Sequence, residues 1–284
     1  MARSARSTRS EGDVLQFLDG GQVVYRDDQV SLVKGNCLAV MDSMPAASVD
    51  LIFADPPYRL SNGGTTCASG KRVAVHKGGW DESGGVAADL AWNVEWLRAC
   101  QRVLKPSGTI WVSGTQHVIF SVGYAMQTLG FHLLNTITWF KPNASPNLAC
   151  RFFTHSTEIV LWAAPMRQKP LQHTFHYRDM KADNGGKQMR DLWPIPEPGG
   201  DQVVWTLPTP PKREKKEGRH PTQKPVELLD RIVRAGSSPG EVVLDPFNGS
   251  GTTGVAAARL GRRYVGIDLD PQYLELTRRR LEAL

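Results

Sequence analysis

The stretch "EVVLDPFNGSGTTGVAAARLGRRYVGIDLD", residues 241–270, decides the expected fold. Its apolar residues at 241–245 predict a strand, and a glycine-rich turn follows at once. An alanine-rich helix and a second apolar strand at 263–268 complete a strand–helix–strand unit. Such units are typical of a parallel sheet that helices cover on both faces.

Other segments of the chain fit the same α/β class. A helix is predicted over 89–104, because apolar residues repeat on one face and Pro106 and Gly108 follow. The last helix begins at Asp270, an N-cap followed by proline at the first helical position. Further strands are predicted at 30–33, 49–54, 109–113, 131–140 and 157–163. The expected architecture is a Rossmann-like, mostly parallel, doubly wound sheet.

Two acidic residues indicate which cofactor the glycine turn fits. Residues 249–254 match the GxGxxG pattern of dinucleotide sites, and Asp268 ends the next strand, where a carboxylate can accept ribose hydroxyls. Asp245 ends the preceding strand, and a pyrophosphate placed there would meet an uncompensated negative charge. S-adenosylmethionine (AdoMet) carries an ammonium and a ribose, so it fits both acids. The alternative is a purely structural helix cap and glycine turn.

A second stretch, "DPPY" at 55–58, also follows a predicted strand. Open α/β sheets bind ligands beyond the carboxyl ends of their strands, so Asp55 and Asp245 share one crevice if their strands are neighbours. The Asp55 carboxylate can accept one hydrogen of an exocyclic amino group, and the Pro56 carbonyl can accept the other. Pro57 stiffens the segment, and Tyr58 offers a ring for base stacking. A rigid turn with an Asp cap is the alternative.

With these motifs the chain resembles the β-class amino-methyltransferases of DNA, in which the catalytic motif precedes the cofactor motif. The shared elements are DPPY, "HPTQKP" at 220–225 and "DPFNGSGTT" at 245–253. The stretches "RLSNGG", "NASPNLACRFFTHSTEIVLWA" and "GKQMRDLW" resemble the small DpnA-like adenine methyltransferases, and CcrM-like enzymes are more distant. The resemblance covers about residues 30–284. It implies an AdoMet-dependent fold, a flipped target base and adenine-N6 as the methylated atom.

The resemblance also implies residue roles. Asp55, Pro56, Pro57 and Tyr58 would hold and stack the target adenine. The predicted cofactor-binding residues are Asn36, Cys37, Asp55, Thr222, Lys224, Asp245, Phe247, Gly249, Ser250, Gly251, Thr252 and Asp268. Among these, Asp268 would take the ribose, and Thr222 and Lys224 would approach the cofactor carboxylate. Asn36 stands where the family commonly has Asp.

Substrate contacts are expected from loops. A substrate loop is predicted at about 59–87 and a target-recognition insertion at about 165–219, within one catalytic domain over 25–284. The predicted DNA-binding residues are Lys71, Arg72, Lys77, Asn143, Asn147, Arg151, Lys212, Arg213, Lys215 and Lys216. Trp139 is expected in the core. His155 and Glu158 are expected as a core hydrogen-bonded pair and not as a metal site.

Composition bounds the remaining possibilities. The chain has 284 residues and a formal net charge of +6, which permits nucleic-acid binding. Its four cysteines form no CxxC pair, so no zinc site is expected and reduced, cytoplasmic thiols are the default. No apolar run is long enough for a membrane span. Residues 1–24 are expected to be a basic, disordered or extended tail, with an organelle transit peptide as the alternative.

The sequence thus predicts direct methyl transfer from AdoMet to adenine N6 in DNA, with GATC as the suggested site and single-stranded DNA as a plausible substrate. The alternatives left open are N4 methylation of cytosine, an RNA target, a non-catalytic DNA- or AdoMet-binding module and a nicotinamide oxidoreductase. A homodimer and a partner restriction endonuclease acting on the same site are further expectations.

Overall fold

The computed structural model describes residues 18–59, 65–68, 71–74, 81–142, 144, 146–148, 150–193, 210–218, 220 and 222–284. Within these ranges one nine-stranded sheet organises the chain, in the spatial order β1-β2-β11-β10-β3-β6-β8-β7-β9. In that order the strands are Gln22–Arg26, Val30–Lys34, Arg263–Asp268, Val242–Asp245, Val49–Ala54, Leu104–Gly114, Thr157–Ala164, His132–Phe140 and Leu192–Trp193. A separate two-stranded hairpin pairs β4 (Thr65–Ala68) with β5 (Lys71–Ala74).

Strand direction places the functional edge of the sheet. The five strands β2, β11, β10, β3 and β6 are parallel. Strand β1 runs antiparallel to β2, and β8 runs antiparallel to both β6 and β7. From β10 the chain proceeds through β11 on one side of the sheet, and from β3 it proceeds to β6 on the other. The strand order therefore switches between β10 and β3, where ligands bind in open α/β sheets. In the register of this pair, Leu244 lies beside Ile52, so Asp245 and Asp55 leave the sheet at the same edge.

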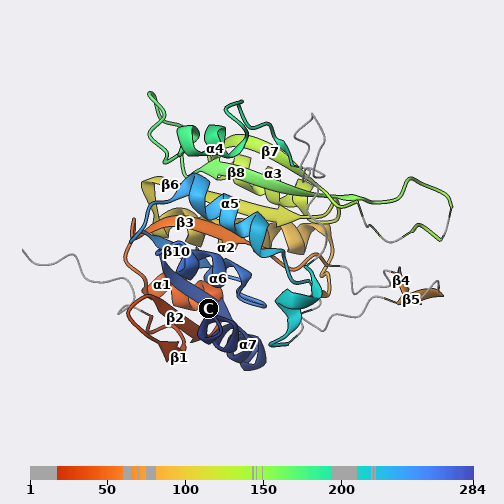
Figure 1. Ribbon diagram of the computed structural model, residues 1–284, viewed down its shortest axis with the longest axis horizontal. Helices are drawn as coiled ribbons and strands as arrows, with labels where there is room; N and C mark the ends of the chain where they lie inside the picture. The colour runs from red at the N-terminus through yellow and green to blue at the C-terminus, as the bar shows by residue number, and fades with distance from the viewer. Residues whose placement is uncertain are drawn as a thin grey trace, which may run out of the picture.

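Helices cover both faces of the sheet. On one face lie α1 (Cys37–Ser43), α2 (Val86–Val103) and α3 (Ile119–Thr128), and on the other lie α4 (Tyr177–Asp183), α5 (Val226–Gly236), α6 (Thr252–Arg259) and α7 (Pro271–Glu282). Figure 1 shows α5 lying across the strands on the side facing the viewer. Because apolar side chains pack against each face, all six residues of β3 are buried. The predicted doubly wound sheet is confirmed.

The predicted elements agree with the structure except at their edges. The predicted strands all form, and the N-cap at Asp270 is confirmed because its carboxylate accepts the Gln272 N–H at 2.8 Å. The predicted helix 89–104 begins three residues earlier, at Val86, and ends at Val103. Pro106 and Gly108 do not form a separate turn but lie within β6, which begins directly after the helix. The elements that were not predicted include β1, the hairpin β4–β5, β9 and the helices α1, α3, α4 and α5.

The predicted boundary of the N-terminal tail is wrong. Leu18 is only 2% exposed and belongs to the core on the α1–α3 face. β1 begins at Gln22 and pairs with β2, so the folded region starts before residue 25. Burial of the apolar Leu18 side chain and the backbone pairing of β1 therefore tie this part of the chain to the domain. Residues 1–17 lie outside the described ranges.

The two predicted loops contain ordered elements. The region 59–87 holds the hairpin β4–β5 and the first residues of α2, while 60–64, 69–70 and 75–80 lie outside the described residues. The region 165–219 contributes α4, β9 and the short 3-10 helix η3 (Lys212–Lys215), while 194–209 and 219 are not described. Part of this insertion packs on the domain, since Met180 of α4 is 2% exposed and β9 pairs with β7.

Candidate active site

A cavity of about 330 Å³ opens where β10 and β3 end. The strand ends, the glycine turn before α6, the start of α1 and the segment before α5 line this cavity together. It holds all four DPPY residues and all but one of the predicted cofactor residues: Asn36, Cys37, Asp55, Pro56, Pro57, Tyr58, Thr222, Lys224, Asp245, Phe247, Gly249, Ser250, Thr252 and Asp268. The structure therefore brings the two sequence motifs into one site.

Gly251 is the exception and does not line the cavity. It is the N-cap of α6 with φ +68°, a left-handed conformation that favours glycine. A Cβ atom added there would lie 2.2 Å from Cγ2 of Thr277 on α7. The glycine is thus required for close packing of the turn against α7. Its predicted contact with a cofactor stays a prediction.

Asp245 is buried at the end of β10 and faces the cavity. Its carboxylate accepts hydrogen bonds from the Thr253 hydroxyl at 2.6 Å and from the Phe247 N–H at 3.0 Å. Burial raises the pKa of Asp245 to about 7, because these two neutral donors do not offset the loss of solvation. A ligand cation would therefore find an acceptor for its charge here.

Asp268 ends β11 on the same cavity. Its carboxylate accepts the Gly249 N–H at 2.8 Å and the Asp270 N–H at 2.9 Å, so it also fixes the glycine turn. Burial raises the pKa of Asp268 to about 6. Each oxygen keeps a lone pair for a further donor such as a ribose hydroxyl.

Helix α7 supports the glycine turn from beneath. The guanidinium of Arg280, which is buried, donates to the Ser250 carbonyl at 2.6 Å and to the Thr252 hydroxyl at 3.0 Å. Asn248 donates to the Thr277 hydroxyl at 2.8 Å. These contacts hold the turn in place between β10 and α6. The residues of α7 that make them belong to no local motif, so sequence reasoning did not find them.

Asp55 lies in a different electrostatic setting from Asp245. Its Oδ2 atom is 2.5 Å from the ammonium of Lys224. Its Oδ1 atom accepts from the Ser113 hydroxyl at 2.5 Å and from the Tyr58 hydroxyl at 2.8 Å. Burial disfavours the ammonium of Lys224, but the carboxylates of Asp55 and Glu158 outweigh that effect and raise the Lys224 pKa. The carboxylate at this strand end is therefore already compensated within the protein.

Lys224 has carboxylate partners that the sequence did not reveal. The predicted role placed its ammonium near a cofactor carboxylate, but the ammonium contacts Asp55 and lies 3.7 Å from Glu158. The backbone carbonyl of Lys224 accepts the Thr252 hydroxyl at 3.1 Å, which ties this residue to the glycine turn. A lysine that is 6% exposed needs carboxylate partners, and the fold provides two.

Glu158 was predicted to pair with His155, and this is wrong. Glu158 instead bonds to Lys141 at 2.7 Å and accepts from the Tyr58 hydroxyl at 3.1 Å. His155 is exposed, and its ring lies 3.2 Å from the amide of Gln116. His155 lies two residues before β8 begins at Thr157, so the alternation of side chains along the strand does not fix the direction of the His155 ring. Trp139, at 2% exposure, is in the core as predicted.

Aromatic rings form one wall of the cavity. Phe247 packs against Trp92 at 5.7 Å and against Trp96 at 5.3 Å between ring centroids. The Arg59 guanidinium lies 4.7 Å from the Trp92 ring centroid. Arg59 directly follows DPPY, and its N–H donates to the buried Asp81 at 2.7 Å. Lining residues to which the sequence analysis assigned no role include Arg59, Asp81, Trp92, His220, Asn248 and Tyr273.

The predicted cofactor-adenine side begins at α1. Asn36 is the N-cap of this helix, and its side chain accepts the Leu38 N–H at 2.9 Å. Asn and Asp cap helices about equally well, so Asn36 can cap α1 although the family commonly has Asp at this position. Burial raises the pKa of the Cys37 thiol to about 12. Cys37 is therefore a neutral, apolar part of the wall.

The structure places part of the predicted DNA-binding set. Lys71 and Arg72 lie on β5 of the projecting hairpin, and Lys212 begins η3, but their side chains are not described. Arg151, Arg213 and Lys216 are exposed, whereas Lys215 is half-buried. The amide of Asn147 donates to the Phe152 carbonyl at 2.6 Å and so shapes its own loop. Lys77 and Asn143 lie outside the described residues.

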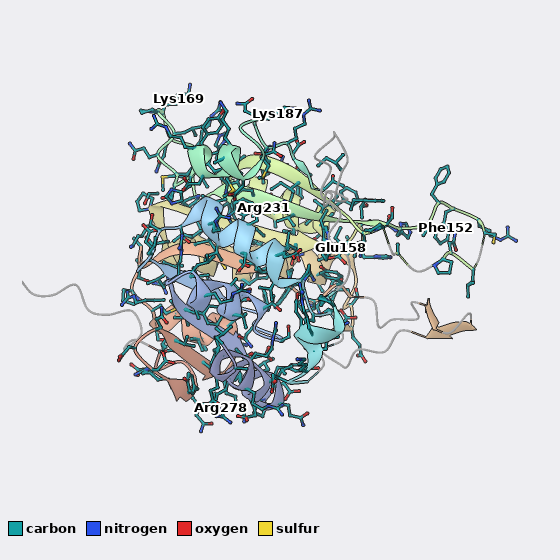
Figure 2. All side chains as sticks on the ribbon, viewed as in Figure 1. Phe152, Glu158, Lys169, Lys187, Arg231 and Arg278 are labelled. Carbon is teal, nitrogen blue, oxygen red and sulfur yellow. The ribbon has the colours of Figure 1, made fainter. Side chains whose placement is uncertain are left out.

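Two of these segments project in one direction. The loop between β7 and β8 and the hairpin β4–β5 both extend to the right of Figure 1, beyond the sheet. Figure 2 shows Phe152 far out on the β7–β8 loop, whereas Glu158 at its base lies close to the body of the domain.

Among the described residues, no group of three His, Cys, Asp or Glu side chains could hold a metal ion. In the same ranges, no helix has the length and apolar character to cross a membrane.

The family of the chain follows from comparison with known proteins. The family described as DNA methylase matches residues 49–279, which include both motifs and nearly the whole sheet. The chain belongs to this DNA methylase family. The Type II methyltransferase M2.DpnII of Streptococcus pneumoniae is 48% identical over 91% of this chain and 92% of that protein. The Type II methyltransferase M2.MboI of Moraxella bovis is 43% identical over 91% and 89%.

Solved structures share the architecture of this DNA methylase family member. The PvuII DNA methyltransferase, which is cytosine-N4-specific, aligns with a TM-score of 0.69 at 19% identity over 92% of this chain and 89% of that chain. A Thermus thermophilus DNA modification methylase solved in complex with S-adenosyl-L-methionine aligns with a TM-score of 0.58 at 25% identity, covering 90% and 95%. The methyltransferase fold predicted from the sequence is therefore confirmed.

The cavity suits AdoMet on the chemistry of its walls. The buried Asp245 carboxylate is bonded to neutral donors and matches an ammonium. Asp268 matches ribose hydroxyls, and the aromatic wall of Phe247 and Trp92 matches the apolar parts of the molecule. The AdoMet cofactor predicted from the sequence thus fits the site that the structure forms.

Proposed function

We propose that this chain methylates DNA at the N6 amino group of adenine, with AdoMet as methyl donor. One observation supports this most strongly: two carboxylates at neighbouring strand ends, Asp55 and Asp245, line one cavity, and among the described residues a lysine contacts Asp55 but not Asp245. The uncompensated Asp245 suits a cationic cofactor. Lys224 compensates the charge of Asp55, so Asp55 suits a neutral amino group. A carboxylate without a cation beside it would not select a neutral group over a cation.

The base-holding half is formed by DPPY. The Asp55 carboxylate accepts one amino hydrogen, and the Pro56 carbonyl accepts the other. Proline lacks an N–H, so the segment presents acceptors and no competing donor at Pro56 and Pro57. Tyr58, which is 6% exposed and held by its hydroxyl, offers its ring face to the base. Together these contacts align the nitrogen lone pair and favour its tetrahedral form.

The cofactor-holding half is formed by the glycine turn. Asp245 takes the ammonium, Asp268 takes the ribose, and Phe247, Gly249, Ser250 and Thr252 line the methionine side. Bound AdoMet supplies the electrophilic methyl group of its sulfonium. Asn36 and Cys37 lie toward the adenine of the cofactor. Thr222 stays in this set, whereas Asp55 is assigned to the base-holding half alone and Lys224 acts through it.

Substrate and partners extend the proposal. The target base must leave the helix stack to reach the cavity, which costs a few kcal/mol for a paired base and less in single-stranded DNA. The exposed Arg151 and Arg213, with Lys71 and Arg72 on the hairpin, would track phosphates. GATC as the recognition site, the β-class motif order, a homodimer, a partner endonuclease and a cytoplasmic location belong to this proposal as well.

The test is transfer of labelled methyl groups from AdoMet to unmethylated DNA, followed by digestion to nucleosides. Single- and double-stranded oligonucleotides with and without GATC are compared. The expected product is N6-methyladenine. N4-methylcytosine would keep the chemistry of the site and overturn the target base. No methylated nucleoside despite AdoMet binding would overturn the proposed function.

A further inference from the structure

Glu158 is a largely buried acid that the reaction described above does not use. It lies on β8, whereas Asp55 follows β3, and β6 separates these two strands in the sheet. The Glu158 side chain is 11% exposed and reaches the cluster beneath the DPPY segment. The described residues that line the cavity do not include Glu158. An effect on methyl transfer would then pass through its neighbours.

Those neighbours are the same groups that contact Asp55. The Tyr58 hydroxyl lies 2.8 Å from Asp55 Oδ1 and 3.1 Å from Glu158 Oε2, and it has only one proton to donate. The Lys224 ammonium lies 2.5 Å from Asp55 and 3.7 Å from Glu158. Glu158 and Asp55 therefore compete for one hydroxyl proton and for one cation.

Acceptor capacity shows why this competition matters. A carboxylate has about four lone-pair sites. Ser113, Tyr58 and Lys224 occupy three sites on Asp55 when all of them donate to it. Each donor lowers the electron density that is left for a further hydrogen bond. When Tyr58 donates to Glu158 and Lys224 shares its charge with Glu158, Asp55 stays a stronger acceptor.

The outer cation completes the arrangement. Lys141, whose side chain is 19% exposed, bonds to the other oxygen of Glu158 at 2.7 Å. Burial disfavours the Glu158 carboxylate, but the ammonium groups of Lys224 and Lys141 outweigh it and lower the Glu158 pKa. Glu158 thus remains ionised, and the two lysines balance the two carboxylates in charge.

We infer that Glu158 is a positioning residue for methyl transfer: it shares the Tyr58 hydroxyl and the Lys224 ammonium with Asp55, so that Asp55 keeps the capacity to accept a hydrogen bond from the target amino group. The inference rests on the proposed function. It also assigns a purpose to Lys141, which holds Glu158 in its ionised form at the base of the β7–β8 loop.

The test is single-turnover methyl transfer by Glu158→Gln, with AdoMet affinity measured by calorimetry on the same protein. We expect the rate to fall by about tenfold or more, because Tyr58 and Lys224 then turn fully to Asp55. AdoMet affinity is expected to stay within about threefold, because Asp245 and the glycine turn are untouched. Asp50→Asn is the matched control, since Asp50 is a buried carboxylate paired with Lys105 at 2.7 Å outside the cavity. Its rate per folded enzyme is expected to equal that of the wild type.

A double-mutant cycle with Tyr58→Phe separates positioning from structure. If Glu158 acts through the Tyr58 hydroxyl, Glu158→Gln adds less to Tyr58→Phe than it costs alone. Glu158→Asp keeps the charge and is expected to recover part of the rate, and it carries the comparison if the Gln variant does not fold. A wild-type rate in Glu158→Gln, or equal loss in the Asp and Gln variants, would overturn the inference. Absence of methyl transfer in the wild type would instead overturn the proposed function.

Discussion

The ends of β10 and β3 lie side by side, yet their carboxylates have opposite surroundings. Asp245, after β10, has a hydroxyl and a backbone N–H as partners, and burial raises its pKa to about 7. Asp55, after β3, has a buried lysine at 2.5 Å and two hydroxyls. One strand end is prepared for a cation that must arrive with a ligand. The other is neutralised in advance and prepared for an uncharged donor.

This difference explains how one cavity can hold two ligands and keep them apart. A cationic ligand gains more at Asp245 than at Asp55, where Lys224 would repel it. An uncharged amino group can donate to Asp55 without bringing a charge, and it offers no positive charge to Asp245. The sheet brings the two carboxylates close together. The side chains around each strand end determine which ligand each carboxylate binds.

The largest expected effect comes from removing the carboxylate at β3. Asp55→Ala is expected to lower the single-turnover rate of methyl transfer by about a thousandfold, a loss comparable to that of a preorganised polar group in other active sites. AdoMet binding, measured by calorimetry, should change by less than about threefold. A rate within about tenfold of the wild type would contradict the assignment of Asp55 to the target base.

Removing the buried cation should affect stability more than any other single change in the site. Lys224→Met removes the cation between Asp55 and Glu158, whose side chains are only 15% and 11% exposed, and leaves Lys141 as the cation that still contacts Glu158. We expect a loss of about 3–5 kcal/mol in the free energy of unfolding. Urea unfolding measures it, with Lys105→Met as control, because that lysine is 39% exposed in its pair with Asp50 and should cost less. Equal losses in the two variants would contradict the account.

The glycine turn at β10 offers a test of packing. Gly251→Ala combines a φ of +68° with a Cβ atom 2.2 Å from Thr277, and we expect it to cost about 2–3 kcal/mol in unfolding free energy. Gly240→Ala is the control, because Gly240 has φ +82° with open space around its added Cβ. The control should show only the strain of its backbone, about 1 kcal/mol. If the two variants lose the same stability, the contact with α7 is not what requires a glycine at 251.

The smallest expected effect is a dependence on pH that belongs to Asp245. AdoMet binding needs this carboxylate ionised and the ammonium of the ligand protonated. The affinity should therefore rise roughly fivefold from about pH 6 to about pH 7.5 and level off as the ammonium, with a pKa near 8, loses its proton. Without AdoMet, the effect of rising pH on folding stability is opposite in sign to its effect on AdoMet affinity. The folded state holds a proton that the unfolded chain has released, so the contribution of Asp245 to stability falls as pH rises from about 4 to about 7. Calorimetry and thermal unfolding across this range check both, and Asp245→Asn should remove both trends.

Much of the fold was predictable from local sequence. Strand–turn–helix periodicity located β3, β10 and β11, and the Asp270-Pro271 cap located the start of α7. The carboxylates of Asp55, Asp245 and Asp268 were also found, because each follows or ends an apolar strand and a cavity forms at that edge. These features depend on residues close together in the chain.

The remaining parts depend on contacts between distant segments. The partners of Asp55 are Ser113 and Lys224, and Glu158 joins them through Tyr58, yet no motif links β6, β8 and the segment before α5. Glu158 and His155 were wrongly predicted to pair because they are close in sequence. The start of β8 at Thr157 lies between them, so only Glu158 belongs to the strand. The tail boundary at 24 was wrong because Leu18 is a single apolar residue whose burial only the folded core reveals.

The most direct test of the central claim compares Asp55→Asn and Asp245→Asn in one pair of measurements. AdoMet binding is followed by calorimetry at about pH 7.5, where Asp245 is mostly ionised. Methyl transfer to DNA is followed by nucleoside analysis. The account predicts that Asp55→Asn binds AdoMet as the wild type does but transfers almost no methyl group, whereas Asp245→Asn loses most of its AdoMet affinity. Loss of AdoMet binding in Asp55→Asn, or unchanged binding in Asp245→Asn, would contradict the division of the cavity between its two carboxylates.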